Sequence, residues 1–164
     1  NMSRAAGNPQ FTKIEAEVQR LQRLGNYFNL LIAAKGQMAN GAMLSSEEFG
    51  VGGSIYGRGY DSSEVLGDSG VAGKLELQLT NPVEINHVRT WQVYTFLDGG
   101  RVWNRDATAA SDKVISLAST GLGMRFTLPS ETRFGGYVAL PLNRDVQTEG
   151  NQDPRFYFNF SQSF

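Results

Sequence analysis

The sequence predicts an all-β fold in which seven antiparallel strands form part of a transmembrane β-barrel. Three observations support this prediction: segments that alternate apolar and polar residues, connections that alternate between short and long, and a composition with 19 glycines, ten phenylalanines and 11% aromatic residues. The mean hydropathy of −0.31 does not argue against a membrane location. Barrel strands are short alternating segments that hardly change this average.

The composition excludes several classes of function. The chain has 164 residues with 15 basic and 16 acidic side chains, and this near-neutral charge argues against a nucleic-acid-binding protein. Cysteine is absent, and His87 is the single histidine. The absence of cysteine excludes disulfides and thiolate chemistry, and a single histidine is too few for a histidine metal site and makes a Ser-His-Asp triad improbable. We therefore expect no metal, no cofactor and no enzymatic activity.

Seven segments have the period of two that is typical of strands with one apolar face. In chain order they are residues 11–24, 27–38, 71–79, 88–98, 116–128, 132–143 and 155–164. Their apolar faces carry Ile14, Ala16 and Val18; Phe28, Leu30, Ile32 and Ala34; Val71, Leu75, Leu77 and Leu79; Trp91, Val93 and Leu97; Ala118, Leu122, Met124 and Phe126; Phe134, Val138, Leu140 and Leu142; and Phe156, Phe158, Phe160 and Phe164.

The opposite faces of these segments are mostly polar. If the strands enclose a pore, the polar side chains line its lumen while the apolar ones face lipid. The residues that we expect to line the lumen are Lys74, Glu76, Gln78, Gln92, Tyr94 and Arg125, and Asp98 lies on the same face.

The connections alternate between short and long along the whole chain. Gly25-Asn26, 81–87 and Pro129-Ser130-Glu131 are short, whereas 39–70, about 104–113 and about 144–154 are long. A β-sandwich gives no reason for this alternation, whereas outer-membrane barrels have short periplasmic turns and long extracellular loops. The alternative interpretation is a soluble all-β domain whose sheet has one face exposed to solvent.

Seven strands cannot close an even-stranded bacterial barrel, and an open sheet edge in lipid would leave backbone groups unpaired. We therefore expect that the chain either oligomerises or is the C-terminal part of a longer protein. The start at Asn1 without a signal peptide favours the second expectation.

The segment Phe49–Asp61 is too rich in glycine to be predicted as a strand, and too aromatic for a merely flexible loop. Gly57 and Gly59 flank Arg58, which allows a sharp turn that presents one guanidinium at its tip. Because arginine stays charged and forms bidentate pairs with carboxylates, this tip is suited to docking on an acidic side chain.

This loop region resembles that of the hemolysin secretion/activation transporters, the TpsB-type outer-membrane proteins of two-partner secretion. The resemblance rests on Gly52-Gly53, Gly57-Arg58-Gly59-Tyr60-Asp61, Gly67-Asp68-Ser69-Gly70 and Leu75-Glu76-Leu77, and further on Arg20-Leu21-Gln22, Gly36-Gln37, residues 96–103 and the terminal Phe164. It implies that the seven strands are strands ten to sixteen of a sixteen-stranded barrel. It also implies that residues 39–70 are the sixth extracellular loop, folded back into the barrel, and that periplasmic domains and further strands precede this chain.

The resemblance also implies a function and its partners. It places the protein in the outer membrane of a Gram-negative bacterium, where it would export an unfolded partner protein such as an adhesin, hemolysin or toxin. Its other partners would be outer-membrane lipid and the barrel-assembly machinery. A barrel-assembly insertase of the same superfamily and a soluble β-rich binding module are the alternatives.

Carried over residue by residue, the resemblance assigns the loop tip to Gly57, Arg58, Gly59 and Tyr60. Asp98 would be the carboxylate partner of Arg58, with Glu76 as the second candidate for that role. Gly57 departs from the family pattern, which has a hydrophobic residue before the arginine. The C-terminal aromatic pattern with Phe160 and Phe164 resembles the signal that the assembly machinery reads.

Overall fold

The computed structural model describes residues 11–81, 85–105 and 113–163. This part of the chain is all-β, with one short 3-10 helix, η1, at Ser45–Glu47. None of the described residues belongs to a helix that is long and apolar enough to cross a membrane.

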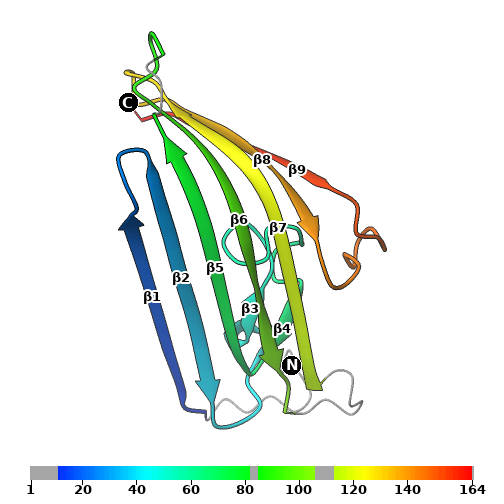
Figure 1. The fold of residues 1–164 in the computed structure, drawn as a ribbon. Helices are drawn as coiled ribbons and strands as arrows, with labels where there is room; N and C mark the ends of the chain where they lie inside the picture. The colour runs from blue at the N-terminus through cyan, green and yellow to red at the C-terminus, as the bar shows by residue number, and fades with distance from the viewer. Residues whose placement is uncertain (1–10, 82–84, 106–112, 164) are drawn as a thin grey trace.

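Seven long strands form one sheet in the order β1-β2-β5-β6-β7-β8-β9, with every neighbouring pair antiparallel (Figure 1). Each strand coincides with one of the seven segments that have a period of two, so the prediction of seven antiparallel strands is confirmed. The strands are β1 (Lys13–Arg23), β2 (Phe28–Ala39), β5 (Ser69–Thr80), β6 (Thr90–Trp103), β7 (Val114–Thr127), β8 (Arg133–Pro141) and β9 (Arg155–Ser161).

Two further strands were not predicted. β3 (Phe49–Val51) pairs with β4 (Val65–Gly67) in a small antiparallel sheet of their own. The expectation that residues 49–61 contain no strand is therefore wrong at the start of that segment. The short pairing satisfies backbone N–H and C=O groups that would otherwise be buried without partners, because Phe49, Val51 and Val65 are all buried.

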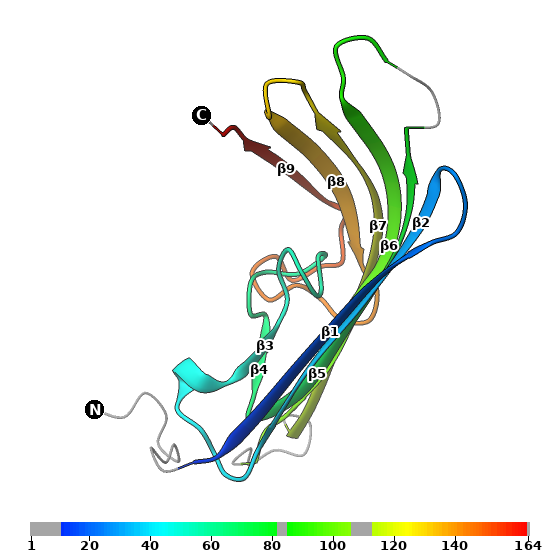
Figure 2. The same cartoon turned by 90° about the vertical axis from the view of Figure 1, so that its left-hand side faces the viewer.

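The main sheet is curved, and the segment between β2 and β5 lies on its concave side (Figure 2). The strand register places the predicted polar faces together on this concave face; for example, Lys74 pairs with Asp98, which pairs in turn with Ser119. The long connections lie at one end of the sheet and the short ones at the other, as the antiparallel order requires.

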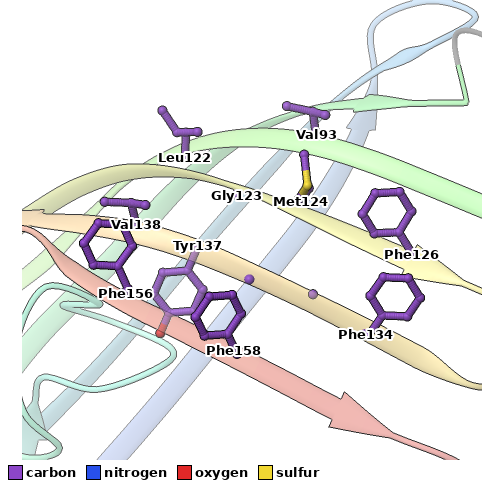
Figure 3. A pocket seen from close by; sticks show the side chains of 12 residues that line it. Val93, Leu122, Gly123, Met124, Phe126, Phe134, Tyr137, Val138, Phe156 and Phe158 are labelled. Atoms are coloured by element: carbon purple, nitrogen blue, oxygen red, sulfur yellow. The ribbon is translucent and has the colours of Figure 1, made fainter.

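The convex face carries the apolar side chains, and many of them are exposed. Phe158 of β9 has 87% of its surface exposed, and in the described residues no second layer of structure covers this face. A hollow of about 350 Å³ opens on it over β6 to β9, lined by apolar side chains that include Met124, Val138 and Phe158 (Figure 3). Exposed apolar patches of this extent are rare in soluble monomers and typical of surfaces that meet protein or lipid.

The main hydrophobic core lies between the concave face and the segment that covers it. Phe49, Val51 and Val65 of that segment pack with Ala72 of β5 and Val102 of β6. The folded-in segment therefore supplies the second layer that every sheet needs on one of its faces.

Replacing Gly70 by valine should displace this second layer. A Cβ atom at Gly70 would lie 2.1 Å from Cδ1 of Phe49, and forcing extra atoms into a packed core destabilises a protein by about 1–3 kcal/mol. We expect a protease to cut residues 40–68 faster in Gly70→Val than in the unaltered protein, measured by limited proteolysis and mass spectrometry.

Gly73→Val is the matched control in the same strand, because a Cβ atom there meets only the carbonyl oxygen of Ala33, at 3.5 Å. Equal cleavage rates in Gly70→Val and Gly73→Val would contradict the proposed packing of Phe49.

Candidate functional site: a buried arginine at the tip of the folded-in loop

The two glycines beside Arg58 are required for different reasons. Gly57 has a φ of +89°, which favours glycine, and a Cβ atom there would lie 2.6 Å from Cδ1 of Leu117. Gly59 has no unusual φ, but its Cβ atom would lie 2.9 Å from the backbone nitrogen of Pro141. The tip of the loop is therefore pressed directly onto β7 and β8. Leu117 occupies the space beside Gly57.

Arg58 forms ion pairs with two carboxylates. Its Nε donates to Oδ2 of Asp98 at 2.5 Å, and its Nη1 donates to Oε2 of Glu76 at 2.7 Å. All three side chains are almost completely buried, with exposed fractions of 5%, 0% and 2% for Arg58, Asp98 and Glu76. Asp98, the predicted partner, and Glu76, the second candidate, thus both contact the guanidinium. We call these three residues the tip cluster.

Asp98 accepts three further hydrogen bonds at its Oδ1. The donors are the backbone N–H groups of Gly57 (3.0 Å) and Arg58 (3.1 Å) and the hydroxyl of Ser119 (2.5 Å). A buried carboxylate is stable only when its lone pairs are satisfied, and here four donors converge on it. Asp98 therefore holds the backbone of the loop tip as well as its charge.

Aromatic rings complete the surroundings of Arg58. Its Cζ lies 3.6 Å from the ring centroid of Phe96, and Cζ of Arg125 lies 3.8 Å from that of Tyr94. Phe96 and Tyr137 meet edge to face, with their centroids 6.0 Å apart. These contacts favour a cation at this position and keep water away from it.

The polar residues predicted on one face do lie together on the concave face. Arg125 Nη1 donates to Glu76 at 2.9 Å and to Gln92 at 2.9 Å, while Gln78 donates to Glu76 and Gln92 donates to Gln78. Glu76, Gln78 and Tyr94 are buried, whereas Lys74 and Gln92 are partly exposed and Arg125 is exposed.

A second set of contacts joins the loop to the β8–β9 connection. The hydroxyl of Tyr60 donates to Oδ1 of Asn143 at 3.1 Å. Asp61 accepts hydrogen bonds from the Thr148 hydroxyl at 2.6 Å and from Arg155 Nη2 at 2.7 Å. These residues, 80 or more positions apart in the chain, form the rim contact, which is more exposed than the tip cluster.

Two more carboxylates hold the sides and base of the loop. Glu64 accepts a hydrogen bond from the backbone N–H of Gln147 at 2.6 Å. Asp68 is fully buried and accepts from the backbone N–H groups of Met43 (2.7 Å) and Arg105 (2.9 Å). The loop is thus fastened at its tip, at its rim and at its base.

Sequence reasoning missed several of these residues. The period of two places Ser119 on the same face as Asp98, and this signal could have identified it as a partner. Phe96 lies within the string that carried the resemblance, but nothing in the sequence showed that its ring would stack on Arg58. The rim contact of Asp61, Thr148 and Arg155 left no signal at all, because it depends on two loops meeting in space.

Of the two residues assigned to the assembly signal, Phe160 lies on the convex face of the edge strand β9 and is 70% exposed. Phe164 lies outside the described residues. In the described ranges, no three His, Cys, Asp or Glu side chains come together in a group that could hold a metal ion.

Comparison with known proteins identified one family. A family model described as haemolysin secretion/activation protein ShlB/FhaC/HecB matches residues 1–126. No curated protein and no solved structure matches the chain.

The rim contact should depend on pH through Asp61. The pKa of this carboxyl lies below its ordinary value of 3.8, mainly because the Thr148 hydroxyl donates to it and also because Arg155 pairs with it. A lowered pKa means that the contact contributes stability above pH 3.8 and loses that contribution as the pH falls through the lowered value. We expect spin labels at Ser62 and Gln152 to show a short, narrow distance distribution at neutral pH that broadens in acid.

Asp61→Asn should give a broader distribution at neutral pH and remove the acid dependence. Identical distributions for the unaltered protein at neutral and acid pH would contradict the role of Asp61.

Proposed function

Because the chain belongs to the haemolysin secretion/activation family, we propose that it is the C-terminal part of an outer-membrane β-barrel that exports an unfolded partner protein from a Gram-negative bacterium. In this proposal β1, β2 and β5 to β9 are strands ten to sixteen of a sixteen-stranded barrel. The convex face meets lipid, the concave face lines the pore, and residues 39–70 are an extracellular loop folded into it.

The observation that carries this proposal is the burial of Arg58 between Glu76 and Asp98 on the concave side. A soluble sheet has no need to bury a cation at the tip of a long glycine-rich loop. The wall of a pore needs such a buried cation, because the ion pair holds the loop inside the pore at a defined place. The exposed apolar convex face supports the same proposal, since lipid is the environment that would cover it.

Export by such a barrel makes and breaks no covalent bond. The concave face offers hydrogen-bonding side chains such as Gln92 and Arg125, which an extended polypeptide can engage and release one after another. The loop determines how much of that face is accessible. A buried ion pair contributes little net stability, but it selects one loop conformation, and removing one partner leaves a buried charge at a cost of about 3–5 kcal/mol.

Charge reversals in the tip cluster test the proposed function. In cells that carry the complete gene and its partner, we expect Arg58→Asp or Asp98→Arg to lower the amount of exported partner protein about tenfold or more, as loss of a buried pair predicts. The measurement is the partner protein in the culture medium, normalised to folded transporter in the outer membrane.

The double variant that exchanges the two charges should restore part of the export, because it rebuilds the pair at position 98 although it loses the contact with Glu76. Arg133→Asp is the matched control, since Arg133 is exposed and distant from the tip cluster. Equal export by the single variants and the unaltered protein would contradict the role of the pair.

The C-terminal aromatic residues provide a test of assembly. We propose that Phe160 and Phe164 form the signal that the barrel-assembly machinery reads, and we expect Phe160→Ser combined with deletion of Phe164 to reduce the fraction of protein inserted in the outer membrane. Heat-modifiability on gels measures the inserted fraction. Leu142→Ser, which changes an exposed apolar residue outside that signal, is the control, and unchanged insertion in the double variant would remove the assignment.

A further inference from the structure

A hollow of about 350 Å³ opens on the concave face beside the loop tip. Its lining comes from Ser54 and Arg58 of the loop, Tyr94 of β6, Arg125 of β7, Tyr137 of β8, and Tyr157, Phe158 and Asn159 of β9. We call it the inner hollow. It shares Tyr137 and Phe158 with the apolar hollow of Figure 3, so the two hollows adjoin at the β8–β9 pair.

Two cations, Arg58 and Arg125, line the inner hollow. Both pair with Glu76, and Arg58 pairs also with Asp98. Among the described residues, the carboxylate that pairs with Arg125 is therefore one that it shares with Arg58. The Arg125 side chain is 44% exposed and remains open to a further anion.

The inner hollow also contains hydrogen-bond donors without acceptors. Nη2 of Arg58 is buried and has no hydrogen-bond partner in the described part of the chain. The rings of Tyr137 and Tyr157 stack with their centroids 4.8 Å apart, and no described residue forms a hydrogen bond with either hydroxyl. A buried donor without a partner, such as Nη2 of Arg58, is rare in native proteins and calls for a missing partner, whereas the two tyrosines are only partly buried.

We propose that the inner hollow is a carboxylate-binding site, and that an aspartate or glutamate side chain of the exported polypeptide occupies it. The inference rests on the proposed function. Nη2 of Arg58 has no partner and Arg125 shares its one carboxylate, so that a guanidinium edge with nearby hydroxyls is open to the two oxygens of a further carboxylate. A bare anion needs far less space than 350 Å³, whereas a side chain on an extended chain needs room of this order.

Block of the pore by peptides tests the site. The complete protein is reconstituted in planar bilayers, and a Gly-Ser decapeptide with one central glutamate is compared with the same peptide carrying glutamine. We expect the glutamate peptide to block the current at a concentration about tenfold lower, as a charge-assisted hydrogen bond predicts. Sodium acetate is the third probe, and it should block weakly or not at all.

Two variants and one control connect this difference to the inner hollow. Tyr157→Phe removes one hydroxyl and keeps the stacked ring, while Arg125→Gln removes one cation; both should reduce the preference for the glutamate peptide. Arg133→Gln removes an exposed arginine outside the hollow and should leave the preference unchanged. Since Arg125 also contacts Glu76, Tyr157→Phe gives the cleaner result.

Equal block by the two peptides would overturn the proposal. A strong effect of acetate without any preference between the peptides would also overturn it, because the site would then bind small anions only. If cells export the partner protein normally while the peptides block equally, the carboxylate site fails and the proposed function stands. If the unaltered protein exports nothing, the proposed function itself fails.

Discussion

The buried guanidinium of Arg58 is the interaction on which the rest of the arrangement depends. Its two carboxylate partners lie on adjacent strands, Glu76 on β5 and Asp98 on β6, and the β5–β6 register places them diagonally on one face. Shifting either strand by one residue would turn its acid to the opposite face. The same carboxylate of Asp98 also accepts the backbone N–H groups of the loop tip. Strand register, loop conformation and charge pairing therefore require one another.

The second constraint is that only the concave face of the sheet is covered by another part of the chain. The concave face is polar, and the folded-in loop covers its centre with Phe49, Val51 and Val65 while satisfying its charges at the tip. The convex face remains open and apolar. The backbone hydrogen bonds of each strand go to its neighbours in the sheet, while the loop contributes side-chain packing and the contacts of its tip.

The strands and their faces could be predicted because a period of two is a local property, and it placed Asp98, Gln92 and Tyr94 correctly on one face. The resemblance assigned Asp98 as the partner of Arg58 and Glu76 as the second candidate; it did not indicate that both would pair with it, although a guanidinium has enough donors for two acids. The pairing of β3 with β4 was missed because Gly50 and Gly67 suggest a turn more than a strand. The link from Asp61 to Arg155 spans 94 positions and depends on how two loops meet, which no local pattern records.

The contacts of the loop differ in exposure, and this difference sets an order of release. The rim contact is partly exposed, with 32% of the Asp61 side chain and 16% of the Arg155 side chain accessible, so salt and acid act on it first. The tip cluster is excluded from water and is screened much less. A change in solution therefore loosens the β8–β9 connection before it reaches Arg58.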